Sequence, residues 1–249
     1  MVEAIEIEDI LNGMDDLVGL GPYKDAMRGI VKAATPGSIA ERPVHYAYVG
    51  NPGRGKVAVA GMMGRILGRM GVIKRGLFLE LDRDDMTGLS GEQAVRKLST
   101  AAATGRGGIL FIDDAPAVYR LTGQLFRDLL EQRETIVVLS GSKDEMDQLL
   151  AMPEFVSKVA LALYFPDFTP GELLEVAVRM AEDYQLTMTD GAKEKLLQLL
   201  TQKQDRIGQL GNARYAKHLV DRAYRNAASR IMGEEDADKL LPDDIEDVG

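Results

Sequence analysis

The segment Gly50-Asn-Pro-Gly-Arg-Gly-Lys56-Val57 constrains this chain more than any other, because it has the G-x-x-x-x-G-K pattern of a phosphate-binding loop. It lies between an apolar run that ends at Val49 and a stretch of helical periodicity that reaches about Met70. Glycines let backbone N–H groups turn toward phosphate oxygens, the helix N-terminus adds a positive dipole, and Lys56 can reach the outer phosphates. The alternative is a chance match in an ordinary loop. The predicted phosphate site consists of Gly50, Asn51, Pro52, Gly53, Arg54, Gly55, Lys56 and Val57.

Short apolar runs alternate with helical stretches through the first two thirds of the chain. Helices are expected at about 56–70, 93–103, 123–132 and 143–150. Strands that alternate with helices indicate a parallel sheet with helices on both faces, and therefore an α/β fold. The five expected strands are 45–50, 77–82, 108–114, 135–141 and 159–165.

After Pro166 the pattern changes to helical periodicity without strands, up to about residue 232. Thr169-Pro-Gly-Glu has the form of a helix start with proline in the first turn, and further helices are expected to open at Thr189 and near Leu210. The predicted organisation is an acidic flank at 1–16, an α/β nucleotide-binding domain at 17–167, a small all-helical domain at 168–232 and an acidic tail at 233–249.

Composition and charge exclude several classes of protein. The 249 residues include no cysteine, so a disulfide framework, a thiolate zinc site, an iron–sulfur cluster and a cysteine nucleophile are all ruled out. The net charge is −9, but six acids lie in 1–16 and eight in 234–249. We expect both ends to be solvated flanks. The middle is only mildly cationic, which suits a small anionic ligand better than a nucleic-acid duplex.

The same patterns bear on location and partners. No apolar run approaches the roughly 20 residues of a membrane span. The acidic N-terminus has the character of neither a signal peptide nor a transit peptide. We therefore expect a cytoplasmic protein with no membrane partner and no nucleic-acid partner.

Two acids, Asp113 and Asp114, form the carboxyl end of the predicted strand 108–114, at the edge of the sheet where α/β proteins bind ligands. Asp113 is predicted to orient Mg²⁺. Asp114 stands where ATPases with a phosphate-binding loop commonly have a glutamate that polarises the attacking water. Asp114 is one methylene shorter than glutamate, and a displacement of about 1 Å can cost ~10²-fold in rate. The alternative is that both acids only cap the strand. Val57 follows Lys56 where a serine or threonine would give Mg²⁺ a hydroxyl ligand, so we expect weakened Mg²⁺ binding.

Six segments together carry a resemblance to a known family: LVGLGPYKDAM (17–27), YVGNPGRGK (48–56), GILFIDDA (108–115), VVLSGSKDEMDQLL (137–150), PEFVSKV (153–159) and GNARYAKHLVDRA (211–223). They resemble the AAA+ ATPases of the CbbX/SpoVK type, which include the red-type rubisco activase. The resemblance covers about residues 15–230. It implies an AAA+ domain with a parallel five-stranded sheet, a helical lid, ATP or ADP with Mg²⁺ as ligands, and a ring of homologous subunits, usually a hexamer, that acts on a protein client.

Several functional residues follow from the resemblance. Leu17, Val18 and Gly19 match the stretch that cups adenine, and Arg214 matches the lid arginine that contacts the outer phosphate. The alternative for Arg214 is a solvated arginine on a helix. The polar residue that senses the γ-phosphate is either Ser140 or Ser142.

Other positions depart from the family pattern. The segment 84–92 has no aromatic residue, whereas the family has a pore-loop aromatic there that grips polypeptide. Val156 and Lys158 stand where the family has two arginines of the finger, and the lysine ammonium cannot reproduce a planar guanidinium fork.

Three hypotheses follow from this mixture of kept and changed residues. The first is a protein that binds ATP or ADP at an inter-subunit site with weak or absent hydrolysis, and acts as a structural or regulatory subunit of a ring. The alternative is an active ATP-hydrolysing remodelling chaperone of the rubisco-activase type, with compensating residues such as Lys158. The third is an interaction module whose phosphate pocket is empty.

Overall fold

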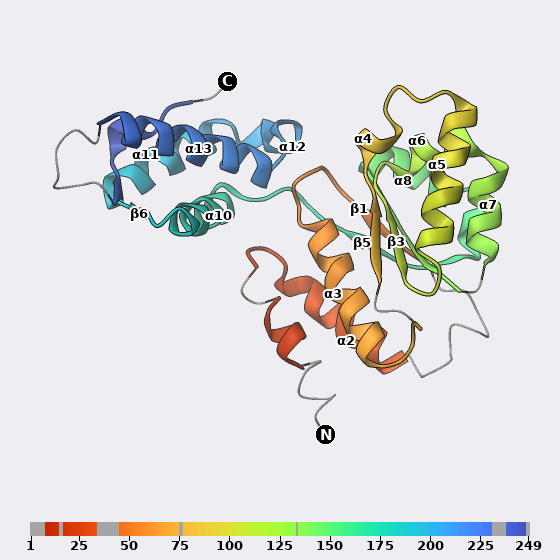
Figure 1. The fold of residues 1–249 in the computed structure, drawn as a ribbon. Helices are drawn as coiled ribbons and strands as arrows, with labels where there is room; N and C mark the ends of the chain where they lie inside the picture. The colour runs from red at the N-terminus through yellow and green to blue at the C-terminus, as the bar shows by residue number, and fades with distance from the viewer. Residues whose placement is uncertain are drawn as a thin grey trace. The chain divides into compact units, whose positions relative to one another are not determined.

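The computed structural model describes residues 8–14, 17–33, 45–74, 77–132, 134–230 and 238–247. The chain forms two compact units (Figure 1). The first comprises residues 1–50 and 55–165, and the second comprises residues 51–54 and 166–249. The chain therefore passes from one unit to the other and back within the glycine-rich loop.

The first unit is built on a five-stranded parallel sheet with the strand order β2-β3-β4-β1-β5. Every strand lies within a predicted run, so the predicted α/β fold with a parallel five-stranded sheet is confirmed. The strands are β1 (His45–Val49), β2 (Phe78–Leu81), β3 (Ile109–Ile112), β4 (Ile136–Gly141) and β5 (Val159–Tyr164).

Helices flank this sheet, and some of them were not predicted. The short ones hold too few residues to show a helical period, and one of them opens after a residue with left-handed backbone, Asp114, with a φ of 52°. The helix Gly21–Ala33 was also not predicted, and its 13 residues are enough for a period, so this reason does not apply to it. The described helices of this unit, besides the helical residues 8–12, are α2 (Gly21–Ala33), α3 (Lys56–Arg69), α4 (Arg83–Met86), α5 (Gly91–Thr104), α6 (Ala115–Thr122), α7 (Gln124–Glu131), α8 (Lys143–Leu150) and α9 (Pro153–Val156).

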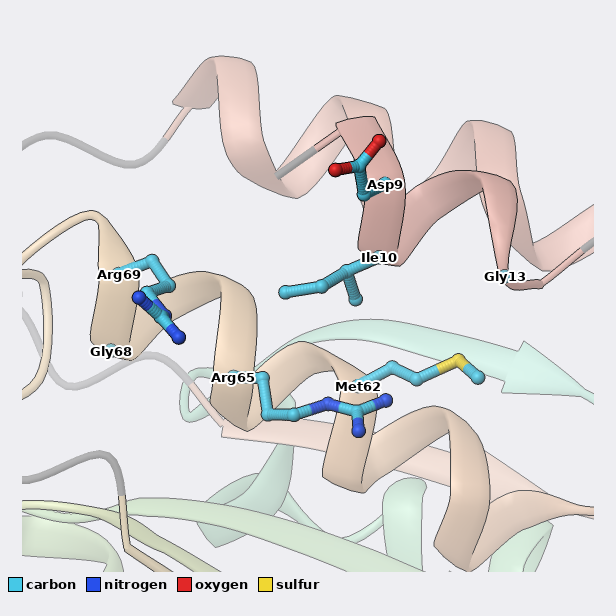
Figure 2. A pocket seen from close by; sticks show the side chains of 7 residues that line it. All are labelled: Asp9, Ile10, Gly13, Met62, Arg65, Gly68 and Arg69. Carbon is cyan, nitrogen blue, oxygen red and sulfur yellow. The ribbon is translucent and has the colours of Figure 1, made fainter. Parts of the chain in front are cut away.

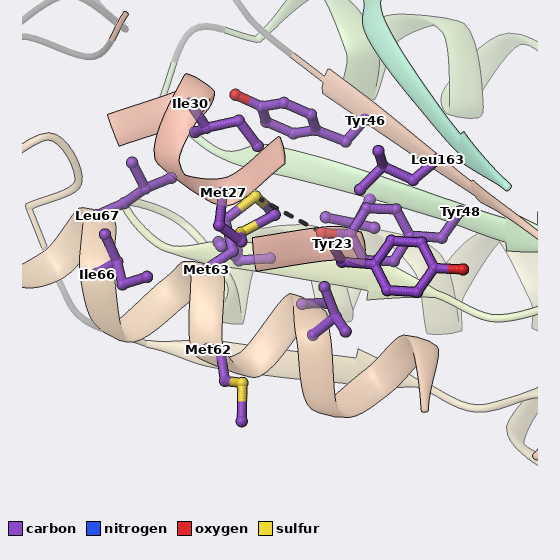
Figure 3. Packing of buried hydrophobic residues seen from close by; sticks show 14 of the residues in the cluster. Tyr23, Met27, Ile30, Tyr46, Tyr48, Met62, Met63, Ile66, Leu67 and Leu163 are labelled. Carbon is purple, nitrogen blue, oxygen red and sulfur yellow. Dashed lines mark hydrogen bonds between the residues drawn. The ribbon is translucent and has the colours of Figure 1, made fainter. Parts of the chain in front are cut away.

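Successive side chains of a strand point to opposite sides, and helices cover both faces of the sheet, so β1, β3 and β4 are buried on both faces. On one face, Tyr48 packs with the side chains of α2 and α3 (Figure 3). Phe111 belongs to the same cluster. On the other face, Val49 and Ile112 pack with α5, α6 and α7. Burial on both sides therefore explains the continuous apolar runs of the sequence. The same packing holds the carboxyl ends of the central strands in place.

His45 links β1 to its neighbours. Its ring is fully buried, its Nδ1 accepts the N–H of Val137 at 3.0 Å, and its Nε2 lies 3.0 Å from the carbonyl oxygen of Leu130. Nδ1 must be unprotonated to accept, so Nε2 carries the proton and donates. Burial lowers the pKa of His45 to about 4, and the imidazole is neutral in the fold.

The second unit is mainly helical. The side chain of Thr169 accepts the N–H of Glu172 and Pro170 occupies the first turn, so the predicted helix start is confirmed. None of the helices in the described ranges is long and apolar enough to cross a membrane. The elements of this unit are α10 (Pro170–Asp183), β6 (Thr187–Met188), α11 (Asp190–Gln202), η2 (Gln204–Arg206), α12 (Ile207–Leu210), α13 (Ala213–Arg230), β7 (Lys239–Leu240) and η4 (Pro242–Asp244).

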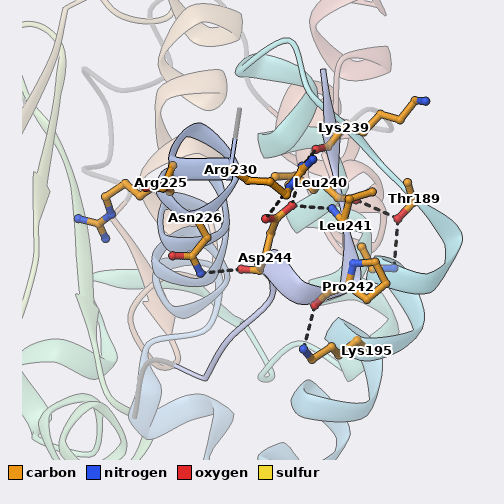
Figure 4. A network of polar contacts seen from close by, with 12 residues as sticks. Thr189, Lys195, Arg225, Asn226, Arg230, Lys239, Leu240, Leu241, Pro242 and Asp244 are labelled. Carbon is orange, nitrogen blue, oxygen red and sulfur yellow. Dashed lines mark hydrogen bonds and ion pairs between the residues drawn. The ribbon is translucent and has the colours of Figure 1, made fainter. Parts of the chain in front are cut away.

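Most acids in the described part of the two ends are exposed, but the expectation that these ends are solvated flanks is wrong for Asp244 and for the apolar residues that pack there. In the C-terminal segment, β7 pairs in parallel with β6, and Asp244 is only 3% exposed, with its carboxylate bonded to Arg230 and to the N–H of Leu241 (Figure 4). The expectation of no strand after Pro166 is also wrong. Strands of two residues have no detectable period, and composition does not reveal that an acid meets a cation of a preceding helix.

The described part of the N-terminal flank also differs from the expectation of a solvated segment. Leu11 and Met14 are buried in the cluster that α2 and α3 form on one face of the sheet. Residues 1–7 and 15–16 of this predicted flank lie outside the described residues.

Candidate nucleotide-binding site

The lysine of the glycine-rich loop begins α3. Lys56 is only 7% exposed, and its Nζ donates to the carbonyl oxygen of Gly50 at 2.6 Å. Gly50 has a φ of 152°, and a Cβ there would lie 2.3 Å from the carbonyl oxygen of Phe165. The start of the loop thus requires glycine, and the ammonium group is held against the loop's own backbone.

The end of β4 joins the start of this loop to the first of the two acids. Gly50 donates its N–H to the carbonyl oxygen of Gly141 at 2.9 Å, and Ser140 donates its Oγ–H to Oδ1 of Asp113 at 3.0 Å. The parallel register explains this, because Val49 pairs with Gly141 and Ile112 pairs with Leu139. Gly50 and Asp113 therefore lie at the same edge of the sheet.

The same geometry separates the two serines that the sequence left open. Ser140 is fully buried beside Asp113, whereas Ser142 donates to Oε2 of Glu145 at 2.9 Å, at the start of α8. Ser140 is therefore the serine that contacts the predicted Mg²⁺-orienting acid. Its role as a phosphate sensor stays a prediction.

Asp114 has a contact that the sequence did not suggest. Its Oδ2 lies 3.5 Å from Nε of Arg83, the first residue of α4. Arg83 was missed because 31 residues separate the two in sequence, and only the adjacency of β2 and β3 brings them together. A pocket of about 250 Å³ lies beside them, lined by Arg83, Met86, Thr87, Asp113, Asp114, Ala117, Val118, Arg120 and Leu121.

The stretch Leu17, Val18 and Gly19 is half-buried in the first unit. Leu17 packs against the apolar cluster under α2 and α3. The next residue, Leu20, places Cδ1 only 3.2 Å from where a Cβ of Gly55 would be. The segment predicted to cup adenine thus leads directly to the glycine before Lys56.

Residues 51–54 of the loop pack within the second unit. Gly53 accepts the N–H of Ala213 at 3.2 Å, and a Cβ on Gly53 would lie 2.1 Å from the carbonyl oxygen of Gly211. The guanidinium of Arg54 lies 3.4 Å from the ring centroid of Phe168, and the side chain is 2% exposed. Arg54 thus packs on an aromatic ring.

Arg214, predicted to contact the outer phosphate, lies beside the loop within this unit. It shares a pocket of about 510 Å³ with Asn51 and Pro52. The lining residues are Asn51, Pro52, Gly208, Gln209, Leu210, Gly211, Arg214, Lys217 and His218. The structure therefore brings together Arg214 and the loop residues Asn51 and Pro52.

The segment that aligns with the family's finger is firmly packed but lacks a free cation among its described residues. Phe155 is buried edge-on to Tyr119, and Glu154 accepts the hydroxyl of Tyr119 at 2.9 Å. Val156 is 65% exposed, and Nζ of Lys158 is bonded to Oε2 of Glu131 at 2.7 Å. An apolar side chain thus projects at one finger position, and an internal ion pair holds the cation of the other.

The donor set fits a magnesium nucleotide. Mg²⁺ is usually held by one or two carboxylates together with phosphates and water, and Asp113 with Ser140 provides that kind of site. Across the described ranges, no group of three or more histidine or acidic side chains could form an all-protein metal site. Lys56 and the glycine cradle supply the complement to phosphate.

Another pocket lies between the helical N-terminal residues and α3 (Figure 2). Its volume is about 630 Å³, and it contains none of the residues predicted for nucleotide binding. It is lined by Asp9, Ile10, Gly13, Met62, Arg65, Gly68 and Arg69.

Comparisons with known proteins agree with this geometry. A sequence model described as an AAA lid domain matches residues 169–248. A single-residue mutant of RuvB from Thermotoga maritima matches with a TM-score of 0.60 at 16% identity, over 93% of this chain and 69% of that chain, which is a likeness of fold alone.

Two relatives match nearly the whole chain. The chloroplastic ribulose bisphosphate carboxylase/oxygenase activase of Cyanidioschyzon merolae is 31% identical over 248 residues, which cover 91% of this chain and 84% of that protein. Protein CfxQ of Xanthobacter flavus is 32% identical over 248 residues, which cover 91% of this chain and 78% of that protein. The strand order β2-β3-β4-β1-β5 and the match of the second unit to an AAA lid domain agree with this similarity. The chain therefore belongs to the CbbX/CfxQ family of AAA+ ATPases, to which the red-type rubisco activase belongs.

Proposed function

We propose that this chain is a ring-forming AAA+ subunit that binds ATP with Mg²⁺ and hydrolyses it to remodel a protein client. The observation that carries the proposal is similarity over 91% of the chain to proteins named as an activase and as CfxQ. Members of the AAA+ class typically form oligomeric rings. The client we infer is a protein assembly, because one relative is named as the activase of an enzyme, ribulose bisphosphate carboxylase/oxygenase.

In this proposal each part of the loop has a separate task. Lys56 exchanges the carbonyl of Gly50 for an outer phosphate oxygen, and the loop N–H groups bind the remaining phosphate oxygens. Asp113, which accepts a hydrogen bond from Ser140, would orient the Mg²⁺ ion, and Asp114 would face the attacking water. Arg214 binds the outer phosphate, and Leu17, Val18 and Gly19 contact adenine. ATP supplies the phosphoanhydride bond, and Mg²⁺ neutralises charge on its phosphates.

A second candidate function is a ring subunit that binds nucleotide and scarcely hydrolyses it. Two ion pairs favour it, because Arg83 approaches the carboxylate of Asp114 and Glu131 holds the ammonium of Lys158. Val156 projects without a charge. A finger arginine is worth about 10³–10⁵ in rate, so its lack would leave a slow site.

ATP binding and steady-state hydrolysis by the assembled protein test both candidates. We expect the wild type to bind and hydrolyse ATP and Lys56→Ala to lose both. Lys193→Ala, which removes an exposed lysine paired only loosely with Asp190, is the control and should change neither. Tight binding with turnover far below about 1 s⁻¹, the low end of typical enzyme rates, selects the second candidate. If the wild type binds no nucleotide, both are wrong.

A further inference from the structure

Three segments of the second unit meet at one polar junction. Asn51 belongs to the phosphate loop, Asp167 to the linker before α10, and Asn212 to the turn before α13. Nδ2 of Asn51 lies 3.0 Å from each carboxylate oxygen of Asp167, and Nδ2 of Asn212 lies 2.8 Å from Oδ1 of the same carboxylate. One carboxylate thus accepts from amides that lie 161 residues apart in the chain.

Asn212 uses both amide hydrogens and its amide oxygen in this junction. Its Oδ1 accepts the N–H of Phe168 at 2.9 Å, and its Nδ2 donates to Asp167 and to the carbonyl oxygen of Pro52 at 3.2 Å. The residue is fully buried and has a φ of 54°, a left-handed conformation that asparagine tolerates better than most residues. The position therefore selects asparagine for both its backbone and its amide.

α12 closes the junction with a glycine. A Cβ on Gly208 would lie 2.3 Å from Nδ2 of Asn51 and 2.3 Å from Oδ2 of Asp167, so any side chain there would displace the amide and the carboxylate from the junction. At the neighbouring backbone, Ala213 donates its N–H to Gly53. The loop residues 51–54 and the first residue of α13 are consequently joined through both side chains and main chain.

The next residue of α13 is Arg214, which shares a pocket with Asn51 and Pro52. Because the first turn of the helix is bonded to the loop, the direction of Arg214 relative to residues 51–54 depends on Asn212 and Asp167. We infer that Asn212 and Asp167 are positioning residues for triphosphate recognition. They hold the loop residues 51–54 and Arg214 as one preassembled anion-binding element and do not touch the phosphates. The inference rests on the proposed function, in which this loop binds ATP.

The test couples the junction to Arg214. Asn212→Gly keeps the left-handed backbone and deletes the amide, and we expect it to weaken ATP binding about 10-fold, because misplacement of about 1 Å can cost ~10²-fold at a catalytic site. In the wild type, Arg214→Ala should weaken ATP binding more than ADP binding. In Asn212→Gly, the same arginine substitution should change ATP affinity by less than about 3-fold, because the arginine is already misplaced.

Asn226→Ala is the matched control. It removes another amide, which donates to the carbonyl oxygen of Asp244 in the same unit, and should leave ATP affinity unchanged even if it lowers the melting temperature. A merely structural role for Asn212 predicts the lower melting temperature together with additive effects of the two substitutions on ATP affinity. That additive result would overturn the inference.

A pair of variants that exchanges the carboxylate and the amide between positions 167 and 212 keeps the test decisive if Asn212→Gly does not fold. Asp167→Asn alone removes the carboxylate acceptor, and Asn212→Asp alone places two carboxylates together. The double variant again sets an amide donor against a carboxylate, so we expect it to recover part of the ATP affinity and of the discrimination against ADP. Absence of any recovery in a folded double variant contradicts the inference.

Lys56→Ala separates this inference from the proposed function. If the wild type binds ATP and Lys56→Ala does not, while Asn212 and Arg214 behave additively, the function stands and the junction is only structural. If the wild type binds no ATP, the function and the inference are both overturned.

Discussion

At the scale of single residues, His45 links stability to pH. Its pKa is lowered to about 4 by burial, whereas an unfolded histidine titrates at about 6.5. Below pH 6.5 the unfolded chain binds a proton that the folded chain does not, so stability present above that pH is lost as the pH falls toward 4. We expect His45 to lower the free energy of unfolding by roughly 2 kcal/mol between pH 7 and pH 5.

Urea unfolding of His45→Gln at both pH values checks this. Glutamine retains a donor and an acceptor but does not titrate, so the variant should lose most of that pH dependence. His218→Gln is the control, because His218 is exposed on α13, and it should behave as the wild type. Equal pH dependence in all three proteins would show that His45 is not the responsible group.

Val57 is the second position at which one side chain is expected to decide a property. Val57→Thr adds a hydroxyl next to Lys56, and we expect ATP affinity to depend more strongly on Mg²⁺ than in the wild type, because the metal gains a ligand. Val95→Thr is matched to it, since both valines are 37% exposed on a helix. ATP titrations with Mg²⁺ and with EDTA measure the effect. An unchanged Mg²⁺ dependence would show that residue 57 does not face the metal.

At the scale of elements, β7 and η4 are held to α13 by one ion pair. Arg230 bonds both to the carboxylate of Asp244 and to the carbonyl oxygen of Lys239, and Asp244 is nearly fully buried. Asp244→Ala removes the carboxylate that pairs with Arg230 and the acceptor of the N–H of Leu241, and leaves Arg230 only its bond to the carbonyl oxygen of Lys239. We expect the free energy of unfolding of the second unit to fall by about 3 kcal/mol. This is the low end for breaking a buried ion pair, because Arg230 is partly exposed.

Hydrogen exchange of the α13 amides measures this loss without assuming that both units unfold together. Glu246→Ala is the control, because Glu246 pairs with Arg222 at the surface, and such pairs contribute about 0–1 kcal/mol. Similar exchange in both variants would mean that the Asp244 pair does not anchor the C-terminal elements.

At the scale of the whole molecule, the proposed ring would share each catalytic site between two subunits, so we expect turnover to depend on residues of both. We expect Val57→Thr with Asp114→Glu to raise hydrolysis only slightly, since Asp114 has a φ of 52° and glutamate is less at ease there than aspartate. If the second candidate function holds, adding Val156→Arg and Lys158→Arg should raise hydrolysis by about 10³-fold, because a finger arginine stabilises the transferring phosphoryl group.

Steady-state ATP hydrolysis at equal oligomeric state compares the unmodified, partly repaired and fully repaired chains. Leu197→Arg with Lys193→Arg is the control, since it places the same two side chains on α11 of the second unit. Full recovery with the first pair of substitutions alone would show that the finger positions do not limit turnover. Turnover of about 1 s⁻¹ or more in the unmodified chain would show the same.

The local features of this protein follow from its sequence alone. The five strands, the helix after the glycine loop and the helix start at Thr169 all lie where the sequence predicts them. Burial on both faces produces apolar runs, and capping requires particular residues within one turn, so neighbouring residues are sufficient to encode these features. The phosphate loop belongs to the same class, because its glycines and lysine are contiguous.

The tertiary structure alone decided the contacts between distant residues. It distinguished Ser140 from Ser142, paired Arg83 with Asp114, packed the acidic C-terminal segment on α13 and joined Asn51 to Asn212. Each of these contacts depends on the register of neighbouring strands or on a turn that brings remote segments together. Neither the periodicity nor the composition of a segment can predict such contacts, because the partners are far apart in sequence and become neighbours only in the folded protein.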